Sequence, residues 1–232
     1  MKRSKKYLEA QKQFDKQKFY PIFEACEIVK KISFTKFDAC VELSIKTNLN
    51  PKKAEQNLRG AFMLPNGTGK VKKVVAICDG EDAKAAQEAG ADFVGDADLL
   101  EKIKKGWFDF DIIVATPKMM PKLGVLGKIL GPKGLMPNPK TGTVTTDMKK
   151  AVSDIKKGKV EFMVDKLGNI HLPIGLVSFD AEKLKDNATS FVKEVFRLKP
   201  STVKGQYVQS ITICSTMGPG VKIDIENIRK EK

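Results

Sequence analysis

The residues best suited to hold a phosphate group lie in a glycine-rich run between Gly124 and Pro139. This run is not a nucleotide-binding P-loop, which needs Ser or Thr after its Gly-Lys pair, because Ile129 follows Gly127-Lys128. The GxGxxG spacing of a dinucleotide site is also absent. Backbone amides and lysines of the run could still hydrogen-bond phosphates, and an ordinary structural loop is the alternative. Three lysines are candidate secondary contacts to RNA or tRNA: Lys128, Lys133 and Lys140.

Side chains that could perform catalysis are few. The chain has one histidine, His171, so a histidine-based triad would have to use it. This histidine falls in a predicted strand, where a packed or surface role is common. The carboxylate pair Asp224/Glu226 alternates along another predicted strand and is expected to be solvated, and no GxSxG nucleophile motif is present. We therefore expect no enzymatic activity and no small-molecule substrate.

The cysteines give no sign of a metal centre. Their positions are Cys26, Cys40, Cys78 and Cys214. No two of them have CxxC spacing, whereas a zinc site needs three or four soft ligands close together. The expectation is four reduced thiols in a reducing compartment, with no metal and no cofactor.

The charge of the chain indicates a polyanionic partner. Lysine and arginine number 42 against 28 acidic residues, which gives a net charge of +14. Such a balance attracts RNA, DNA or anionic membrane without choosing among them. The segment 5–20 could form a membrane-binding stripe, but a helix packed on its own domain is the commoner outcome. No run of eighteen apolar residues and no signal peptide is present, so a cytoplasmic protein with no membrane partner is expected.

The first third of the chain is predicted to mix helices with half-buried strands. The lysine-rich segment 5–18 predicts a helix, and Pro21 suits the first turn of a second one. Apolar and polar residues then alternate over residues 39–46, which is typical of a strand with one buried face. Another extended run, residues 59–64, ends in a turn or linker signal at residues 65–69.

The middle of the chain has a different pattern. Short apolar runs at residues 74–78, 92–94 and 111–115 predict buried strands, with helices predicted at 81–88 and 96–105. Buried strands that alternate with helices predict a mostly parallel sheet covered on both faces. The glycine-rich run follows, and Asp147 is predicted to cap a further helix that ends near residue 157.

The last third returns to half-buried strands. Alternating strands are predicted at residues 159–164, 170–174, 207–214 and 221–225. Asp180 is the predicted cap of a helix that runs to about residue 198. The turn Thr216–Gly220 would let an RNA backbone approach closely, although a simple hairpin turn is the alternative. Because these strands are like those of the first third, we predict two domains, the middle one inserted into the other.

Several long motifs, in the same order along nearly the whole chain, resemble the bacterial ribosomal protein L one family, the stalk proteins of the large subunit. The motifs are residues 36–38 with 41–42, 56–60, 89–92, 109–111, 126–144, 165–171 and 216–219. The resemblance implies an α/β fold with a split βαβ α+β sandwich and an inserted Rossmann-like three-layer α/β domain. The terminal rRNA-binding domain would comprise residues 1–67 and 160–232, and the inserted domain residues 68–159, joined by a two-stranded hinge.

The resemblance also implies an RNA site on the terminal domain. The family's motif positions are occupied here by Lys36, Phe37, Glu42, Asp165, Lys166, His171, Ser178, Ser210, Thr216, Met217 and Gly218. One departure is Cys40, where the family usually has Thr or Ser. A thiol is a poorer hydrogen-bonding group than a hydroxyl, which weakens the expectation of an RNA contact at that position.

The family's function sets the expected partners. The resemblance implies a structural constituent of the cytoplasmic ribosome, monomeric there, that binds the stalk region of large-subunit rRNA. It further implies assistance in releasing deacylated tRNA from the exit site and repression of the chain's own operon mRNA. Two rivals are an α/β enzyme that uses the glycine-rich run for a nucleotide and a free-standing RNA-binding regulator outside the ribosome.

Overall fold

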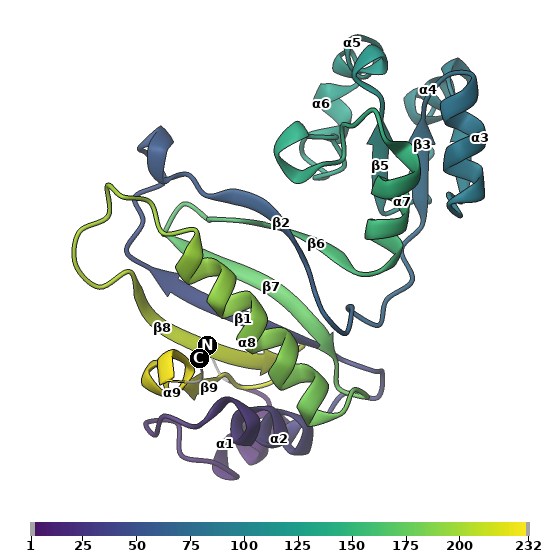
Figure 1. Ribbon diagram of the computed structural model, residues 1–232. Helices are drawn as coiled ribbons and strands as arrows, with labels where there is room; N and C mark the ends of the chain where they lie inside the picture. The colour runs from purple at the N-terminus through teal and green to yellow at the C-terminus, as the bar shows by residue number, and fades with distance from the viewer. Residues whose placement is uncertain (1–2, 231–232) are drawn as a thin grey trace. The chain divides into compact units, whose positions relative to one another are not determined.

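The computed structural model describes residues 3–230 and shows a mixed α/β protein with several sheets, as the sequence predicts (Figure 1). Its internal contacts divide the chain into two compact units. The first unit comprises Met1–Gly69 and Val160–Lys232, and the second comprises Lys70–Lys159. No helix among residues 3–230 is long and apolar enough to cross a membrane.

The first unit is organised around a four-stranded antiparallel sheet in the order β7-β1-β8-β9. Its strands are β1 (Cys40–Thr47), β7 (Asn169–Leu176), β8 (Val208–Ser215) and β9 (Val221–Ile223). Strand β1 comes from the first third of the chain, while both of its neighbours come from the last third. The sheet therefore forms only when segments from the first and last thirds of the chain pair with each other.

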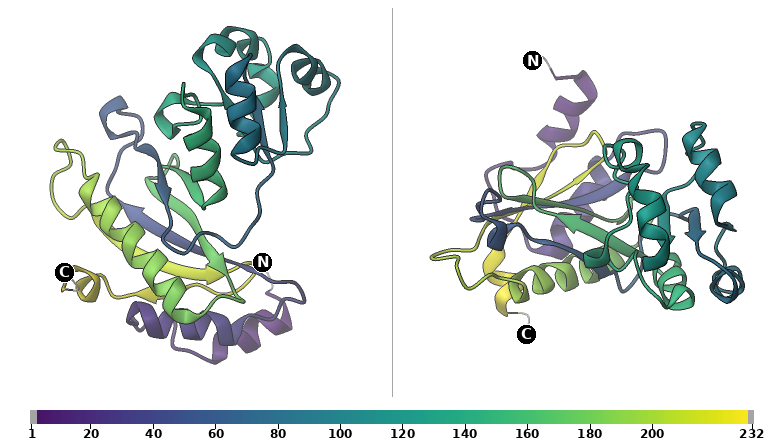
Figure 2. Two further views of the ribbon diagram at one scale, coloured as in Figure 1. Left: turned by 45° about the vertical axis from the view of Figure 1, so that its right-hand side comes forward. Right: turned by 90° about the horizontal axis from the view of Figure 1, so that it is seen from above.

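Helices cover one face of this sheet (Figures 1 and 2). The helices of the first unit are α1 (Lys5–Lys12), α2 (Ile22–Ile32), α8 (Ala181–Arg197) and α9 (Ile225–Lys230). Helices α2 and α8 contact each other, and each carries an apolar stripe at helical spacing. These stripes bury Leu43 and Ile45 of β1, which alternate with polar residues on the other face.

A separate two-stranded sheet pairs β2 (Arg59–Met63) with β6 (Lys159–Met163). It packs onto α8 through aromatic rings, since Phe62 and Phe162 lie 5.7 and 5.2 Å from Phe191, centroid to centroid. The fully buried Phe191 thereby joins this small sheet to the main core. The short 3₁₀ turn η1 (Ala54–Gln56) precedes β2.

The second unit has a three-stranded parallel sheet in the order β4-β3-β5. The strands are β3 (Val74–Ile77), β4 (Phe93–Gly95) and β5 (Ile112–Ala115). Its helices and 3₁₀ turns are α3 (Glu81–Glu88), α4 (Ala97–Lys104), η2 (Pro117–Met119), α5 (Met120–Gly124), α6 (Gly127–Leu130), η3 (Pro139–Thr141) and α7 (Met148–Lys156). Two apolar clusters contain alternate residues of fully buried β3, so both faces of the sheet are covered.

Two local predictions were wrong. Helix α1 ends at Lys12, because Asp15 accepts a hydrogen bond from the amide of Gln17 and starts a turn instead. The last strand ends at Ile223, since the carboxylate of Asp224 accepts from the amide of Glu226 and begins α9. Asp180 is the N-cap residue of α8, as predicted, although its side chain makes no capping hydrogen bond.

Candidate RNA interface

The face of the main sheet that points away from α2 and α8 is polar and accessible to solvent. We call it the polar face and define it by Glu42, Ser44, Lys46, His171, Ser210 and Thr212. The strand register places Ser44 between His171 on β7 and Thr212 on β8. Lys46 lies opposite Ser210, beside a bulge that adds one residue to β8. Carboxylate, hydroxyl, imidazole and ammonium groups thus line one continuous surface.

Contacts between side chains order the centre of the polar face. The Ser44 hydroxyl lies 3.0 Å from Nδ1 of His171, and Nε2 of the same ring lies 3.7 Å from the Asp165 carboxylate. These contacts hold the imidazole between strand β1 and the hairpin that joins β6 to β7. The ring therefore serves as an oriented polar group of the surface.

The hydroxyl of Thr216 joins the end of β8 to the start of β1. It donates to the carbonyl of Cys40 and accepts from the Cys40 amide, each at 3.2 Å. The Thr216 amide also donates to the Cys40 carbonyl, at 2.9 Å. Since its one hydroxyl hydrogen is used here, Thr216 can offer an incoming RNA only an acceptor. The Cys40 thiol points to the carbonyl of Gly175 and is buried, so it does not take the place of a surface hydroxyl.

The turn after β8 projects an apolar side chain into solvent. Met217 has a φ of 65°, the only positive φ of a non-glycine residue that the structure describes, and its side chain is 71% exposed. Such a conformation costs free energy and is found where the surroundings enforce it. The amide of Gly218 closes the turn on Ser215, and a Cβ on Gly218 would lie 2.4 Å from the Ser215 hydroxyl. A side chain at position 218 would therefore force the Ser215 hydroxyl to move.

A carboxylate orders the segment that precedes β1. Asp38 accepts from both the amide and the hydroxyl of Ser178, at 3.1 and 2.6 Å. The bond fixes Ser178, a predicted RNA contact, to the segment that carries Lys36 and the exposed Phe37. Ser178, Thr216, Met217 and these two residues therefore cluster at the beginning of β1.

A second group of predicted contacts lies at the other end of β1. Asp165 accepts from the amides of Leu167 and Asn169 at 2.8 and 2.7 Å and from the Asn169 side chain at 2.9 Å. Partial desolvation acts to raise the pKa of Asp165, but these hydrogen bonds outweigh it and leave the pKa below its usual value. Asp165 thus shapes the hairpin that presents the exposed Lys166.

The predicted site residues of the first unit form two groups joined by the polar face. Glu42, His171 and Ser210 lie on that face, between the groups at the two ends of β1. An eight-residue strand spans roughly 23 Å. This length suits an extended RNA backbone better than a small ligand.

The three predicted secondary contacts lie in the second unit. Lys128, Lys133 and Lys140 are all exposed. The ammonium of Lys133 lies over the Phe108 ring, 3.5 Å from its centroid. The glycine-rich run differs from the expected open loop, because α5 and α6 use many of its amides internally, as in the 2.9 Å bond from Gly131 to Gly127.

Four residues of this surface were missed by the sequence prediction. Ser44 and Lys46 could have been found from the alternation of β1, which places them beside Glu42. Thr212 needed the register of β1 and β8, which a single sequence does not contain. Asp38 belongs to a quoted motif, but its hydrogen bonds to Ser178 span 140 positions. No group of three or more His, Cys, Asp or Glu side chains within residues 3–230 could hold a metal ion.

An open polar face on an α/β protein of net charge +14 is typical of the nucleic-acid-binding class. Residues 29–219 match the model of the ribosomal protein L1p/L10e family, and the chain belongs to that family. It is 58% identical over 224 residues to a large ribosomal subunit protein uL1 of Onion yellows phytoplasma (strain OY-M), covering 97% of both chains. It is 57% identical to a protein of the same name from Phytoplasma australiense, covering 97% of this chain and 98% of the relative. The predictions of a ribosomal family and of no enzyme are thereby confirmed.

Replacing Thr216 with valine should destabilise the fold, because both hydroxyl bonds to Cys40 are lost. We expect the free energy of unfolding to fall by about 1–2 kcal/mol. Urea unfolding followed by far-ultraviolet circular dichroism measures the change. Thr216→Ser keeps the hydroxyl and is the control. Equal stability of the valine and serine variants would show that the hydrogen bonds of the Thr216 hydroxyl contribute nothing to the free energy of unfolding.

The hairpin held by Asp165 should loosen in acid. A carboxyl whose pKa is lower in the folded state stabilises that state above its unfolded pKa, and the stabilisation is lost as the pH falls through the folded value. Below about pH 4, the protection of the Leu167 and Asn169 amides, measured relative to the intrinsic exchange rate at each pH, should therefore fall. Hydrogen exchange followed by NMR measures this. The Asp165→Asn variant should lack the pH-dependent step, and an unchanged step would assign it to another group.

Proposed function

We propose that this chain is a structural constituent of the large ribosomal subunit, and hence of the cytoplasmic ribosome, that binds the stalk region of its rRNA through the first unit. The observation that carries the proposal is the polar face, which lies opposite the helix-covered face and connects two groups of predicted contacts. Membership of a ribosomal protein family supports it, as do the names of the two relatives.

The chemistry of the polar face suits RNA sugars better than phosphates alone. Folded RNA displays 2′-hydroxyl groups and base edges in a wide, shallow groove. Glu42 would repel a phosphate but can accept a hydrogen bond from a 2′-hydroxyl or a base amine. Ser210 and Thr212 can donate and accept, while Lys36 and Lys166 add salt-dependent attraction at the two ends. Met217 and Phe37 offer apolar surface against which a sugar or base can pack.

We assign the terminal rRNA-binding domain to residues 1–67 and 160–232, and the inserted domain to residues 68–159. The division of contacts after Gly69 and Lys159 supports these boundaries. The parallel sheet β4-β3-β5, covered on both faces, supports a Rossmann-like three-layer unit, and the antiparallel sheet packed on α2 and α8 supports a split βαβ sandwich.

The wider roles of the protein follow from the family resemblance. We propose that the chain, as a monomer within the ribosome, assists release of deacylated tRNA from the exit site. We also propose that it represses its own operon mRNA by binding a site that mimics the rRNA one. The exposed ammonium groups of Lys128 and Lys140 support a secondary contact with RNA or tRNA by the second unit.

Truncating Met217 should weaken RNA binding without changing the fold. Met217→Ala removes the exposed thioether, and we expect about 1–3 kcal/mol less binding free energy for a stalk rRNA fragment, because apolar surface that RNA would bury is lost. Filter binding at fixed salt measures it. Val125→Ala in the second unit is the control, because Val125 is 72% exposed. Equal affinity of both variants would remove the turn after β8 from the site.

Cosedimentation tests the ribosomal assignment itself. The chain should stay with large subunits in high salt, since many polar contacts besides phosphate attraction hold it. Loss from the subunits, together with retained binding to free RNA, would favour a regulator outside the ribosome.

A further inference from the structure

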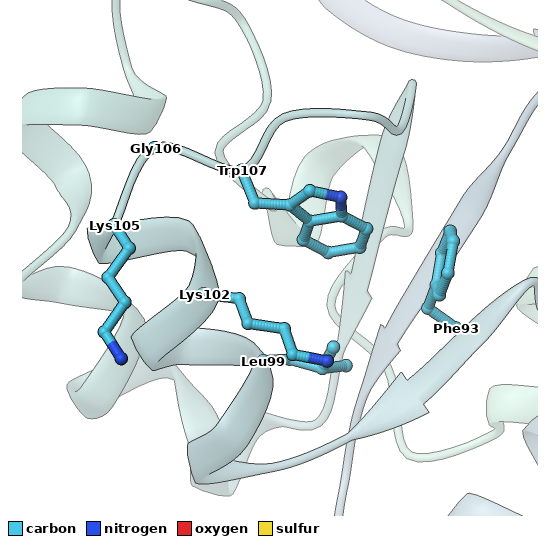
Figure 3. Close-up of a pocket in the computed structure, with 6 residues that line it drawn as sticks. All are labelled: Phe93, Leu99, Lys102, Lys105, Gly106 and Trp107. Atoms are coloured by element: carbon cyan, nitrogen blue, oxygen red, sulfur yellow. The ribbon is translucent and has the colours of Figure 1, made fainter.

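The second unit contains a cavity of about 540 Å³ that the predicted RNA contacts do not include. Its lining residues are Phe93, Leu99, Lys102, Lys105, Gly106 and Trp107 (Figure 3). Three apolar side chains and two lysines form the walls, and no acidic side chain is among them. This volume is within the range of small-ligand sites.

The end of helix α4 builds one wall of this cavity. Gly106 has a φ of 95°, and the amide of Trp107 turns back to the carbonyl of Lys102 at 3.0 Å. The Lys105 amide donates to the carbonyl of Glu101, so carbonyls of the last helical turn are occupied. The Lys102 side chain leans toward Leu99, one turn back, which keeps its ammonium away from the negative end of the helix (Figure 3).

Two aromatic rings in contact with each other form another wall beside these charges. Phe93 and Trp107 lie edge to face, with centroids 4.8 Å apart and an interplanar angle of 87°. Trp107 also packs on Phe110 of the core, which fixes the indole, while Phe93 remains 37% exposed. Neither Lys102 nor Lys105 is paired with a carboxylate among the side chains that the structure describes. The cavity therefore matches a ligand that joins a flat ring to an anion.

We propose that this cavity binds one unpaired nucleotide of a single-stranded RNA segment. Its base would stack on the partly exposed ring of Phe93, beside Trp107, and its phosphate would lie at Lys102 and Lys105. Stacking on aromatic side chains beside lysines is the general means by which proteins hold single strands. A nucleotide fits better than an acidic peptide, because ring and anion are adjacent within one residue of an RNA strand. The site is separate from the polar face and does not depend on the function proposed for it.

The chain carries its own reporter for this site, since Trp107 is its one tryptophan. We would titrate the full chain at low salt with hexauridylate and hexaadenylate and follow the fluorescence of Trp107. A stacked base should quench the indole in a saturable way. The comparison ligands are AMP and an acidic peptide that contains one phenylalanine. The proposal expects tighter binding of the oligonucleotides than of either comparison ligand.

Two variants connect the quenching to the cavity. Lys102→Gln should weaken oligonucleotide binding about threefold to tenfold and reduce the slope of log affinity against log salt by about 0.7, as for one lost phosphate contact. Lys104→Gln removes the same charge from an exposed position of α4 outside the cavity and is the matched control. Phe93→Leu keeps an apolar side chain but removes the aromatic wall, and should weaken binding at least about fivefold.

Each other outcome overturns the proposal. AMP binding as tightly as the hexamers would indicate a free-nucleotide site, and quenching by the peptide alone would indicate a protein-docking site. No quenching, or equal loss in the Lys102 and Lys104 variants, would remove the cavity as an RNA site. Stalk rRNA binding by the same variants, measured separately by filter binding, should stay unchanged, so failure here is distinguishable from failure of the polar face.

Discussion

The pairing of β1 with two strands from the far end of the chain is the constraint on which the first unit depends. More than 120 positions separate Ser44 from His171, yet the register places them opposite each other. Because side chains alternate along a strand, this one register decides which residues enter the core and which form the polar face. A slip by one residue would bury Glu42 and expose Leu43.

The same pairing gives the two faces of the sheet different roles. The face that carries Leu43 and Ile45 is buried under α2 and α8 and supplies the hydrophobic contribution to folding. The opposite face is left to polar groups, whose geometry is fixed at its two ends. Thr216 holds the start of β1 through the Cys40 backbone, and Asp165 holds the hairpin near its end. Several residues of the proposed RNA site therefore shape the surface through hydrogen bonds within the protein.

Local patterns in the sequence predicted most elements but not their long-range contacts. Alternation located β1 within a residue, and the apolar runs located β3 and β5. Helix α1 was overextended, since the turn at Asp15 depends on side-chain bonds that composition does not reveal. The motif resemblance predicted Thr216 and Ser178 as site residues. It did not reveal that their hydroxyls bond to Cys40 and Asp38, which lie well over a hundred positions away in the chain. The aromatic cavity around Trp107 likewise arises only when β4 and the end of α4 come together.

Hydroxyl-radical footprinting with mass spectrometry tests the central claim, that the polar face and its ends bind RNA, most directly. Met217 and Phe37 are 71% and 57% exposed, and Val125 at 72% is a reference in the second unit. Our account predicts that a stalk rRNA fragment protects Met217 and Phe37 from oxidation while Val125 stays reactive. Undiminished oxidation of Met217 and Phe37 in the fully bound complex would contradict it.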